Sequence, residues 1–221
     1  MSEVTRRGFI SAAAGSTALA VLKPSALFAA TKPPTQLPPP SSDAAESLIS
    51  ALKNRKTTRT FSEKPLPQQM LSDLLWAAFG VSRPDSGKRT APSAKNQQEI
   101  DIYVATADGL YLYDANPHQL VQLSAEDIRP FCGKQKFVAG APVNLVYVAD
   151  FSKMGSMGED EKVLYSAADT GFISQNVYLF CAAKRLATVV RGWIDKPALS
   201  EKINLRKDQR VILAQTVGYP K

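Results

Sequence analysis

The sequence has few of the side chains that bind transition metals. It contains one histidine, His118, and two cysteines, Cys132 and Cys181, among 221 residues. A zinc site takes three or four closely spaced ligands of these types, and the spacing here matches no such motif. We therefore predict no metal site and treat His118 as a loop residue. A disulfide between the cysteines stays open, because an oxidising compartment would allow one.

The chain also lacks the strongly basic surface of a nucleic-acid-binding protein. The formal net charge is +7, but outside residues 1–30 only 24 Lys and Arg stand against 19 Asp and Glu. These basic residues do not gather with aromatic residues along one face, so nucleic acid is not an expected partner. Hydrophobic residues make up 44% of the chain and charged residues 21%. Such values are typical of a globular protein with a packed core.

Residues 1–30 have the pattern of an export signal. Thr5-Arg6-Arg7-Gly8-Phe9-Ile10 is a twin-arginine pattern, and a small, apolar run follows it as far as Leu22. An ordinary Sec signal with a basic start is the alternative. We expect export to the periplasm or an equivalent compartment by the twin-arginine route, which carries folded proteins. Cleavage near Ala29 or Ala30 and retention as a membrane anchor both remain open.

Residues 31–42 are expected to form a linker before a domain at 43–221. Lys32–Ser42 contains five prolines, which oppose helix formation and favour an extended chain. The expected role is a spacer between the domain and the membrane or the cleaved end. A ligand for a proline-recognition domain is the less favoured interpretation.

The stretch Lys53–Phe61 is the strongest candidate for a ligand site. Three cations alternate there with two hydroxyls, as Arg55, Lys56, Thr57, Thr58 and Arg59. Fixed cations, hydroxyls and free backbone N–H groups can hold a phosphate. A solvated loop has the same composition, so this stretch alone does not decide the question.

Hydrophobic periodicity predicts one α+β domain with a small mixed or antiparallel sheet. Helices are expected at 43–54, 67–79, 162–186 and 197–203, and strands at 99–106, 110–113, 142–149, 187–193 and 210–217. Residues 83–96 are expected to be a long loop, and 125–137 a broken helix. The longest helix carries small residues, among them Ala167, Ala168 and Gly171, which suit a core or an interface helix.

Four motifs, taken in order, resemble the nitroreductase family of flavin oxidoreductases over about residues 46–220. The family's Arg-Arg/His-Ser-x-Arg/Lys-x-Phe appears as Arg55–Phe61, and its Pro-Ser-x-x-Asn-x-Gln appears as Pro92–Gln98. The third motif is Asp-x-Gly followed by Gln-Asn in an apolar helix, and here it appears as Asp169, Gly171, Gln175 and Asn176. The fourth is a glycine after the next strand together with the terminal segment, and here it appears as Gly192 and Val217–Pro220. The branch that includes the thiazole/oxazole peptide-maturation dehydrogenases is the most similar.

The resemblance implies a nitroreductase-like α+β fold with one long core helix, and a homodimer with two FMN molecules at its interface. The implied cofactor-binding residues are Arg55, Lys56, Thr57, Arg59, Ser93, Asn96, Val190, Arg191 and Gly192. The first three would hold the phosphate and ribityl side, and Arg59 would approach the N1/O2 edge of the ring. Ser93 and Asn96 would reach the flavin from the partner subunit. The stretch from Val190 to Gly192 would pass N5 with its backbone.

These implied roles agree with flavin chemistry. A cation at N1/O2 stabilises the negative charge of the reduced ring, and a glycine beside N5 permits close backbone approach. No general base is expected, and catalytic residues stay unknown. The chain departs from the family at three places. Arg191 stands where many relatives have Glu, and Arg185-Leu186-Ala187 replaces Gly-Leu-Gly. Many relatives also have a basic tail near the phosphate; here Lys221 would serve alone or not at all. The charge reversal predicts a different substrate or reductant preference.

The leading interpretation is an exported FMN-dependent oxidoreductase that transfers hydride or electrons to a nitroaromatic, a quinone or an activated alkene. Because NAD(P)H is not expected outside the cytoplasm, another protein or a quinol would donate the electrons. A flavin-binding carrier or sensor with little turnover is the alternative. A third hypothesis, an interaction module that has lost FMN, is disfavoured because Arg55, Arg59, Ser93 and Asn96 are retained.

Overall fold

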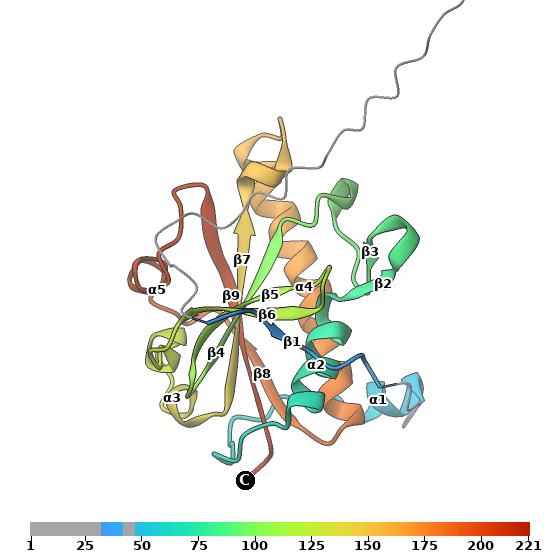
Figure 1. The fold of residues 1–221 in the computed structure, drawn as a ribbon, viewed down its shortest axis with the longest axis vertical. Coiled ribbons are helices and arrows are strands. Elements are labelled where there is room, and N and C mark those ends of the chain that lie inside the picture. The colour runs from blue at the N-terminus through green and yellow to red at the C-terminus, as the bar shows by residue number, and fades with distance from the viewer. Residues whose placement is uncertain (1–31, 42–46) are drawn as a thin grey trace, which may run out of the picture.

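The computed structural model describes residues 32–41 and 47–221 (Figure 1). The expected signal segment and the first residues of the helix expected from 43 lie outside the described residues. Within the described ranges, no helix is both long enough and apolar enough to cross a membrane.

A seven-stranded sheet forms the centre of the fold, in the order β1-β6-β5-β4-β7-β9-β8. Its strands are β1 Thr35–Gln36, β4 Ile100–Thr106, β5 Gly109–Asp114, β6 Gln119–Ser124, β7 Val143–Asp150, β8 Ala187–Arg191 and β9 Gln209–Gly218. All neighbouring strands pair antiparallel, which resolves the choice between a mixed and an antiparallel sheet. Every residue of β7 is buried, because this nearly continuous apolar run is covered on both faces.

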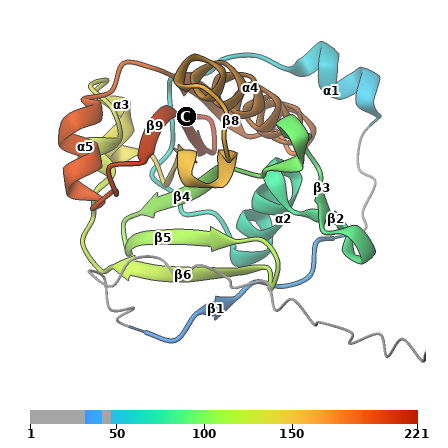
Figure 2. The same cartoon turned by 90° about the horizontal axis from the view of Figure 1, so that it is seen from above.

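Helices cover the two faces of this sheet (Figure 1). The helices are α1 Leu48–Asn54, α2 Gln68–Phe79, α3 Phe137–Gly140, α4 Glu159–Ala183 and α5 Lys196–Lys202, with short 3₁₀ turns η1 Pro84–Ser86, η2 Ala94–Asn96, η3 Arg129–Cys132 and η4 Phe151–Met154. The long helices α2 and α4 pack on one face, and α3 and α5 lie on the other. Helix α1 packs against α4 on its outer side (Figure 2).

The sheet separates two hydrophobic cores. Along β7, Leu145 packs with α2 and α4 and Val146 packs with α5 and η3, as the period of two in a strand requires. Cys181 belongs to the first core and Cys132 to the second, and both are free and buried. The disulfide that the sequence left open is therefore not formed.

The proline-rich segment packs on the domain, so the spacer expected there is wrong for Thr35–Ser41. Strand β1 pairs with β6, and the next side chain, Leu37, is 3% exposed. Ser41 donates to the carboxylate of Asp73 through its N–H and its Oγ, each at 2.8 Å. In the other direction, Ser72 Oγ donates to the Pro38 carbonyl oxygen at 2.5 Å and Gln69 Nε2 to that of Pro39 at 2.9 Å. Side chains of α2 thus bond a segment whose prolines have no N–H for a strand ladder.

His118 lies in the turn between β5 and β6, as expected of a loop residue. Its ring also holds this turn in place, because its Nε2 bonds Ser72 Oγ at 2.7 Å and its Nδ1 bonds Tyr113 OH at 2.9 Å. Other expectations need correction. The expected loop at 83–96 contains part of a small hairpin, β2 Val81–Arg83 with β3 Lys88–Arg89. Strand β6 is an additional strand, and only the short elements η3 and α3 occupy the region of the expected broken helix. These strands are short or polar and gain their stability from pairing.

Candidate flavin site

The basic stretch after α1 lies along the free edge of the sheet. Strand β8 is an outer strand, and the Thr58 N–H donates to the Thr188 carbonyl oxygen at 3.0 Å. At the end of the stretch, Phe61 is buried and forms an isolated bridge with Pro220. These contacts bring the first and last motifs of the sequence side by side.

Tyr178 of α4 joins the basic stretch to the end of β8. Its hydroxyl lies 3.0 Å from Thr57 Oγ1 and accepts the Val190 N–H at 3.1 Å. The Arg55 guanidinium lies over its ring, 5.3 Å from the centroid. Sequence reasoning missed this residue, and the signal that could have found it was a phenol within the apolar part of the long helix.

The same edge of β8 continues to Gly192. The backbone polar groups of residues 188 and 190 point away from β9, toward the free edge of the sheet. Because this direction alternates along a strand, the Gly192 N–H is the next amide to face the free edge. Gly192 is exposed, and a Cβ built there would have only Leu213 Cδ2 near it, at 3.6 Å. An exposed amide on an unpaired sheet edge can donate to a ring nitrogen or to an oxygen of a ligand.

The cations of this stretch are available to an anion. None of Arg55, Lys56 and Arg59 forms an ion pair within the described part of the chain. Lys56 and Arg59 are exposed and Arg55 is partly buried. Hydroxyls and unpaired cations beside backbone donors form a donor set that fits a phosphorylated flavin.

The predicted residues do not all face one cavity. A cavity of about 590 Å³ lies between the basic stretch, the end of α4 and the start of β8. Its polar lining includes Asn54, Lys56, Thr58, Thr60, Arg185 and Lys221. The alternate residues Arg55, Thr57 and Arg59 are not among its lining residues, as expected if they point to the other side of an extended segment. The side chain of Lys56 therefore faces this cavity, whereas that of Arg55 lies on the opposite side of the segment.

Arg185, on the wall of this cavity, has a strained backbone. Its φ is 56°, in the left-handed region, where the family's motif has glycine. We predict that Arg185→Gly raises the free energy of unfolding by about 0.5–1 kcal/mol, because the strain exceeds the entropy that glycine loses. Thermal unfolding would measure this. Arg185→Ala is the matched control, since it removes the same guanidinium and keeps the strained Cβ. Equal stability of the two variants would contradict this explanation.

The side chain of Arg191 points away from this site, contrary to its expected effect on substrate preference. It is 7% exposed, and its guanidinium donates to Asn144 Oδ1 at 2.6 Å, to Thr216 Oγ1 at 2.7 Å and to the Cys132 carbonyl oxygen. Burial lowers its pKa to about 10, so it stays charged at neutral pH. Its backbone polar groups also face β9, where Arg191 pairs with Ala214, so the charge reversal carries no weight for substrate choice.

The loop Pro92–Gln98 is held by α4 and by its own side chains. The Ala94 N–H donates to Asp169 Oδ2 at 2.8 Å, and Ser93 Oγ accepts the Gln98 N–H at 2.9 Å. Asn96 Oδ1 accepts from Gln98 Nε2 at 3.2 Å. The Asp-x-Gly motif thus supports this loop through its first residue. Its partner motif ties α4 to α2, since Asn176 Nδ2 donates to the Ala78 carbonyl oxygen at 3.4 Å.

Two parts of the predicted site lie apart within one chain. The loop is anchored at Asp169 and the basic stretch at Tyr178, nine residues along one helix. That is about 13 Å along the axis. Among the described residues, no hydrogen bond or ion pair joins the loop to Arg55–Phe61 or to Val190–Gly192. A compact ligand would therefore need the loop of a second copy to be enclosed on both sides.

Comparisons with known proteins identify the family of this chain. The model of the nitroreductase family matches residues 52–219. A protein of Methanocaldococcus jannaschii described as a nitroreductase is 31% identical over 155 residues, which cover 66% of this chain and 78% of that protein.

Solved structures of the same fold are also similar. The crystal structure of a protein from Ralstonia eutropha JMP134, described as a nitroreductase, has a TM-score of 0.82 and 42% identity and covers 85% of this chain and 90% of that one. A chain of the Escherichia coli microcin synthetase McbBCD complex has a TM-score of 0.66 and 20% identity, covering 97% of this chain and 85% of that one, and shows the shared fold alone. The chain belongs to the nitroreductase family of flavin-dependent oxidoreductases.

Proposed function

We propose that this protein is an exported FMN-dependent oxidoreductase that passes hydride or electrons from bound flavin to a small organic acceptor. The observation that carries the proposal is the set of unpaired cations at Arg55, Lys56 and Arg59 beside the exposed amide edge of β8. When bound, FMN would supply the redox chemistry. The residues of the chain bind it, orient its ring and set the charge around it.

Each residue of the candidate site is assigned a part of FMN according to its position in the structure. Arg55 and Thr57, on one side of the extended segment, would hold the phosphate and ribityl side, and Tyr178 fixes the Thr57 hydroxyl. Lys56 lines the cavity on the other side of the segment and would add positive charge there. Arg59 would hold the N1/O2 edge of bound FMN, where its charge would favour the anionic reduced ring. The Gly192 N–H would be the donor toward N5, because the Val190 N–H already donates to Tyr178 OH at 3.1 Å.

A second copy of the chain completes the proposed site. Helix α4 exposes Leu164 at 64% and Phe172 at 48%, one turn on either side of the exposed Ala168. Small residues on such a face let another helix approach closely. A homodimer packed through this face would bring Ser93 and Asn96 of one copy toward the basic stretch of the other.

The acceptor class is a nitroaromatic, a quinone or an activated alkene, and the electron donor is a quinol or a redox protein. The acceptor class is inferred from the family. The choice of donor is inferred from the twin-arginine pattern at Arg6 and Arg7, which favours export from the compartment that holds NAD(P)H. A carrier or sensor with little turnover is the alternative, and the absence of NAD(P)H from an exported compartment favours it. The charge of Arg191 does not favour it, because that side chain is buried on the other face of the sheet.

A flavin titration with one arginine variant tests the proposal. Arg59→Ala should weaken FMN binding about tenfold, since it removes one charge-assisted contact of about 1.5 kcal/mol. It should also lower the reduction potential by about 30 mV, the equivalent energy for two electrons. Fluorescence titration and anaerobic spectroscopy would measure the two quantities.

Arg210→Ala is the control, because it removes an exposed arginine whose ion pair with Glu159 lies at the surface. Uptake of no FMN by the unaltered protein would overturn the proposed function. Normal affinity and potential in Arg59→Ala would remove only Arg59 from the site. Reduction by a quinol and reoxidation by a nitroaromatic would separate an enzyme from a carrier.

A further inference from the structure

Glu99 is a buried carboxyl group whose oxygens have no donor. It follows the loop Pro92–Gln98 directly and is 0% exposed. Neither carboxylate oxygen has a hydrogen-bond partner within the described residues. The backbone at this position is well held, because the Glu99 carbonyl oxygen accepts the Asp150 N–H at 2.9 Å. A buried ionised carboxylate in this setting would be strongly unfavourable.

The neighbour of this carboxyl group is a second carboxyl group, on α4. Asp169 is 2% exposed, acts on Glu99 both by its charge and within hydrogen-bonding range, and accepts the Ala94 N–H through Oδ2. An ionised carboxylate only accepts hydrogen bonds, so two ionised groups here would repel each other. A proton on Glu99 turns it into the donor that the contact requires.

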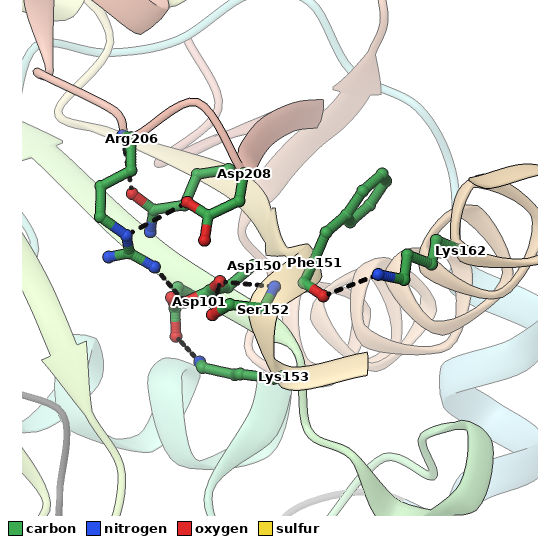
Figure 3. A network of polar contacts seen from close by, with 9 residues as sticks. Asp101, Asp150, Phe151, Ser152, Lys153, Lys162, Arg206 and Asp208 are labelled. Atoms are coloured by element: carbon green, nitrogen blue, oxygen red, sulfur yellow. Dashed lines mark hydrogen bonds and ion pairs between the residues drawn. The ribbon is translucent and has the colours of Figure 1, made fainter. Parts of the chain in front are cut away.

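The nearby lysine is engaged elsewhere. Lys153 of η4 is the basic group that acts on Glu99, but its Nζ donates to Asp101 Oδ1 at 2.6 Å (Figure 3). The next carboxylate, Asp150, is paired with Arg206 at 2.6 Å. Burial raises the pKa of Glu99 to about 7, and the charge of Asp169 adds to the rise.

The loop Pro92–Gln98, which lies next to Glu99 and Asp169, has a backbone conformation that needs support from other contacts. Lys95, Asn96 and Gln98 have positive φ values of 52°, 55° and 50°, which non-glycine residues rarely adopt. Such a conformation persists only where surrounding contacts hold it. The bond from the Ala94 N–H to Asp169 is the contact that ties the middle of the loop to α4.

We propose that Glu99 is a positioning residue of the flavin site: its neutral carboxyl group donates to Asp169, and Asp169 in turn holds the loop that carries Ser93 and Asn96. This inference rests on the proposed function, since those two residues are the flavin contacts. Loss of the Glu99 proton places two negative charges beneath the loop. The loop then loosens, and flavin affinity falls as the pH rises through about 7.

The test compares the unaltered protein with Glu99→Gln between pH 6 and pH 9. Gln donates to Asp169 as neutral Glu does, and it cannot ionise. We expect the FMN dissociation constant of the unaltered protein to rise about tenfold over this range, the change that follows if FMN binding raises the pKa of Glu99 by about one unit. The dissociation constant of Glu99→Gln should follow only the ionisation of the FMN phosphate. Equal pH dependence in both proteins would overturn the inference.

Two measurements without flavin keep this test separate from the proposed function. The folded-state pKa of Glu99 is raised, so its contribution to stability is present below about pH 4.5 and is lost as the pH rises to about 7. Melting temperatures should therefore fall over this range more in the unaltered protein than in Glu99→Gln. Hydrogen exchange of the Ala94 amide should quicken above pH 7, beyond the intrinsic base dependence, in the unaltered protein alone.

Asp169→Asn supplies a second variant in case Glu99→Gln fails to fold. It removes the like charge, so the midpoint of the pH dependence should move to lower pH. An unchanged midpoint would overturn the inference. If the unaltered protein binds no FMN at any pH, the proposed function fails, whereas parallel melting curves and equal exchange refute the role of Glu99 itself.

Discussion

Replacement of Arg191 by alanine is expected to lower the free energy of unfolding by about 3–5 kcal/mol. The guanidinium is buried, and its bonds to Asn144, Thr216 and the Cys132 carbonyl oxygen join β7, β9 and η3 to β8. Truncation leaves these acceptors without a donor and opens a cavity. For a domain of this size the melting temperature should fall by about 6–15 °C.

The comparison with other variants separates loss of the hydrogen bonds from loss of volume. Arg191→Met keeps most of the volume, so a loss close to that of alanine would assign the effect to the unsatisfied acceptors. Gly133→Ala tests the same guanidinium without changing Arg191. A Cβ at position 133 would clash with Arg191 Nη1 at 2.2 Å, so this variant should also destabilise the protein. A change of less than about 1 kcal/mol in Arg191→Ala, the range of the exposed Arg210→Ala, would contradict the structural role.

Charged residues on the exposed face of α4 are expected to convert a dimer to a monomer. In the double variant Leu164→Glu with Phe172→Glu, two carboxylates would have to be buried in the proposed interface. This cost exceeds the stability of an interface of ordinary size. Light scattering after size exclusion should show the mass of two chains in the unaltered protein and of one chain in the variant.

The same variant should bind FMN at least about tenfold more weakly, because the loop of the second copy would be absent. Phe131→Glu is the matched control: Phe131 is 41% exposed and lies in η3, on the other face of the sheet. It should leave both mass and affinity unchanged. A monomeric unaltered protein with full FMN affinity would refute the shared site.

The strongly patterned elements of the fold were predictable from the sequence. The run at β7, the alternation at β4 and the long helix α4 appear at the expected places, within a few residues. Each has a periodicity that local physics fixes, because burial of one or both faces selects it. Strand β6 and strand β1 have no such pattern. They are strands because an antiparallel edge was available to pair with them.

The candidate site shows the same division. The motif residues from Arg55 to Arg59 were found from their chemical types and spacing, which local sequence preserves. Tyr178 was missed, because only the packing of α4 against β8 brings its hydroxyl to Thr57 and Val190. The contact between Glu99 and Asp169 could not be predicted from the sequence either, since Asp169 lies on a helix that begins 60 residues after Glu99.

The sequence by itself determined the family, the α+β class and the residue types of the candidate phosphate-binding stretch. The tertiary structure alone decided the direction of each side chain. Arg191 lies on the edge strand in the expected place, yet its guanidinium lies in the interior and its backbone pairs with β9. The neighbouring Val190 and Gly192 present the free edge instead. Spacing along a chain fixes which residues are near each other, whereas strand register and packing fix which face each one presents.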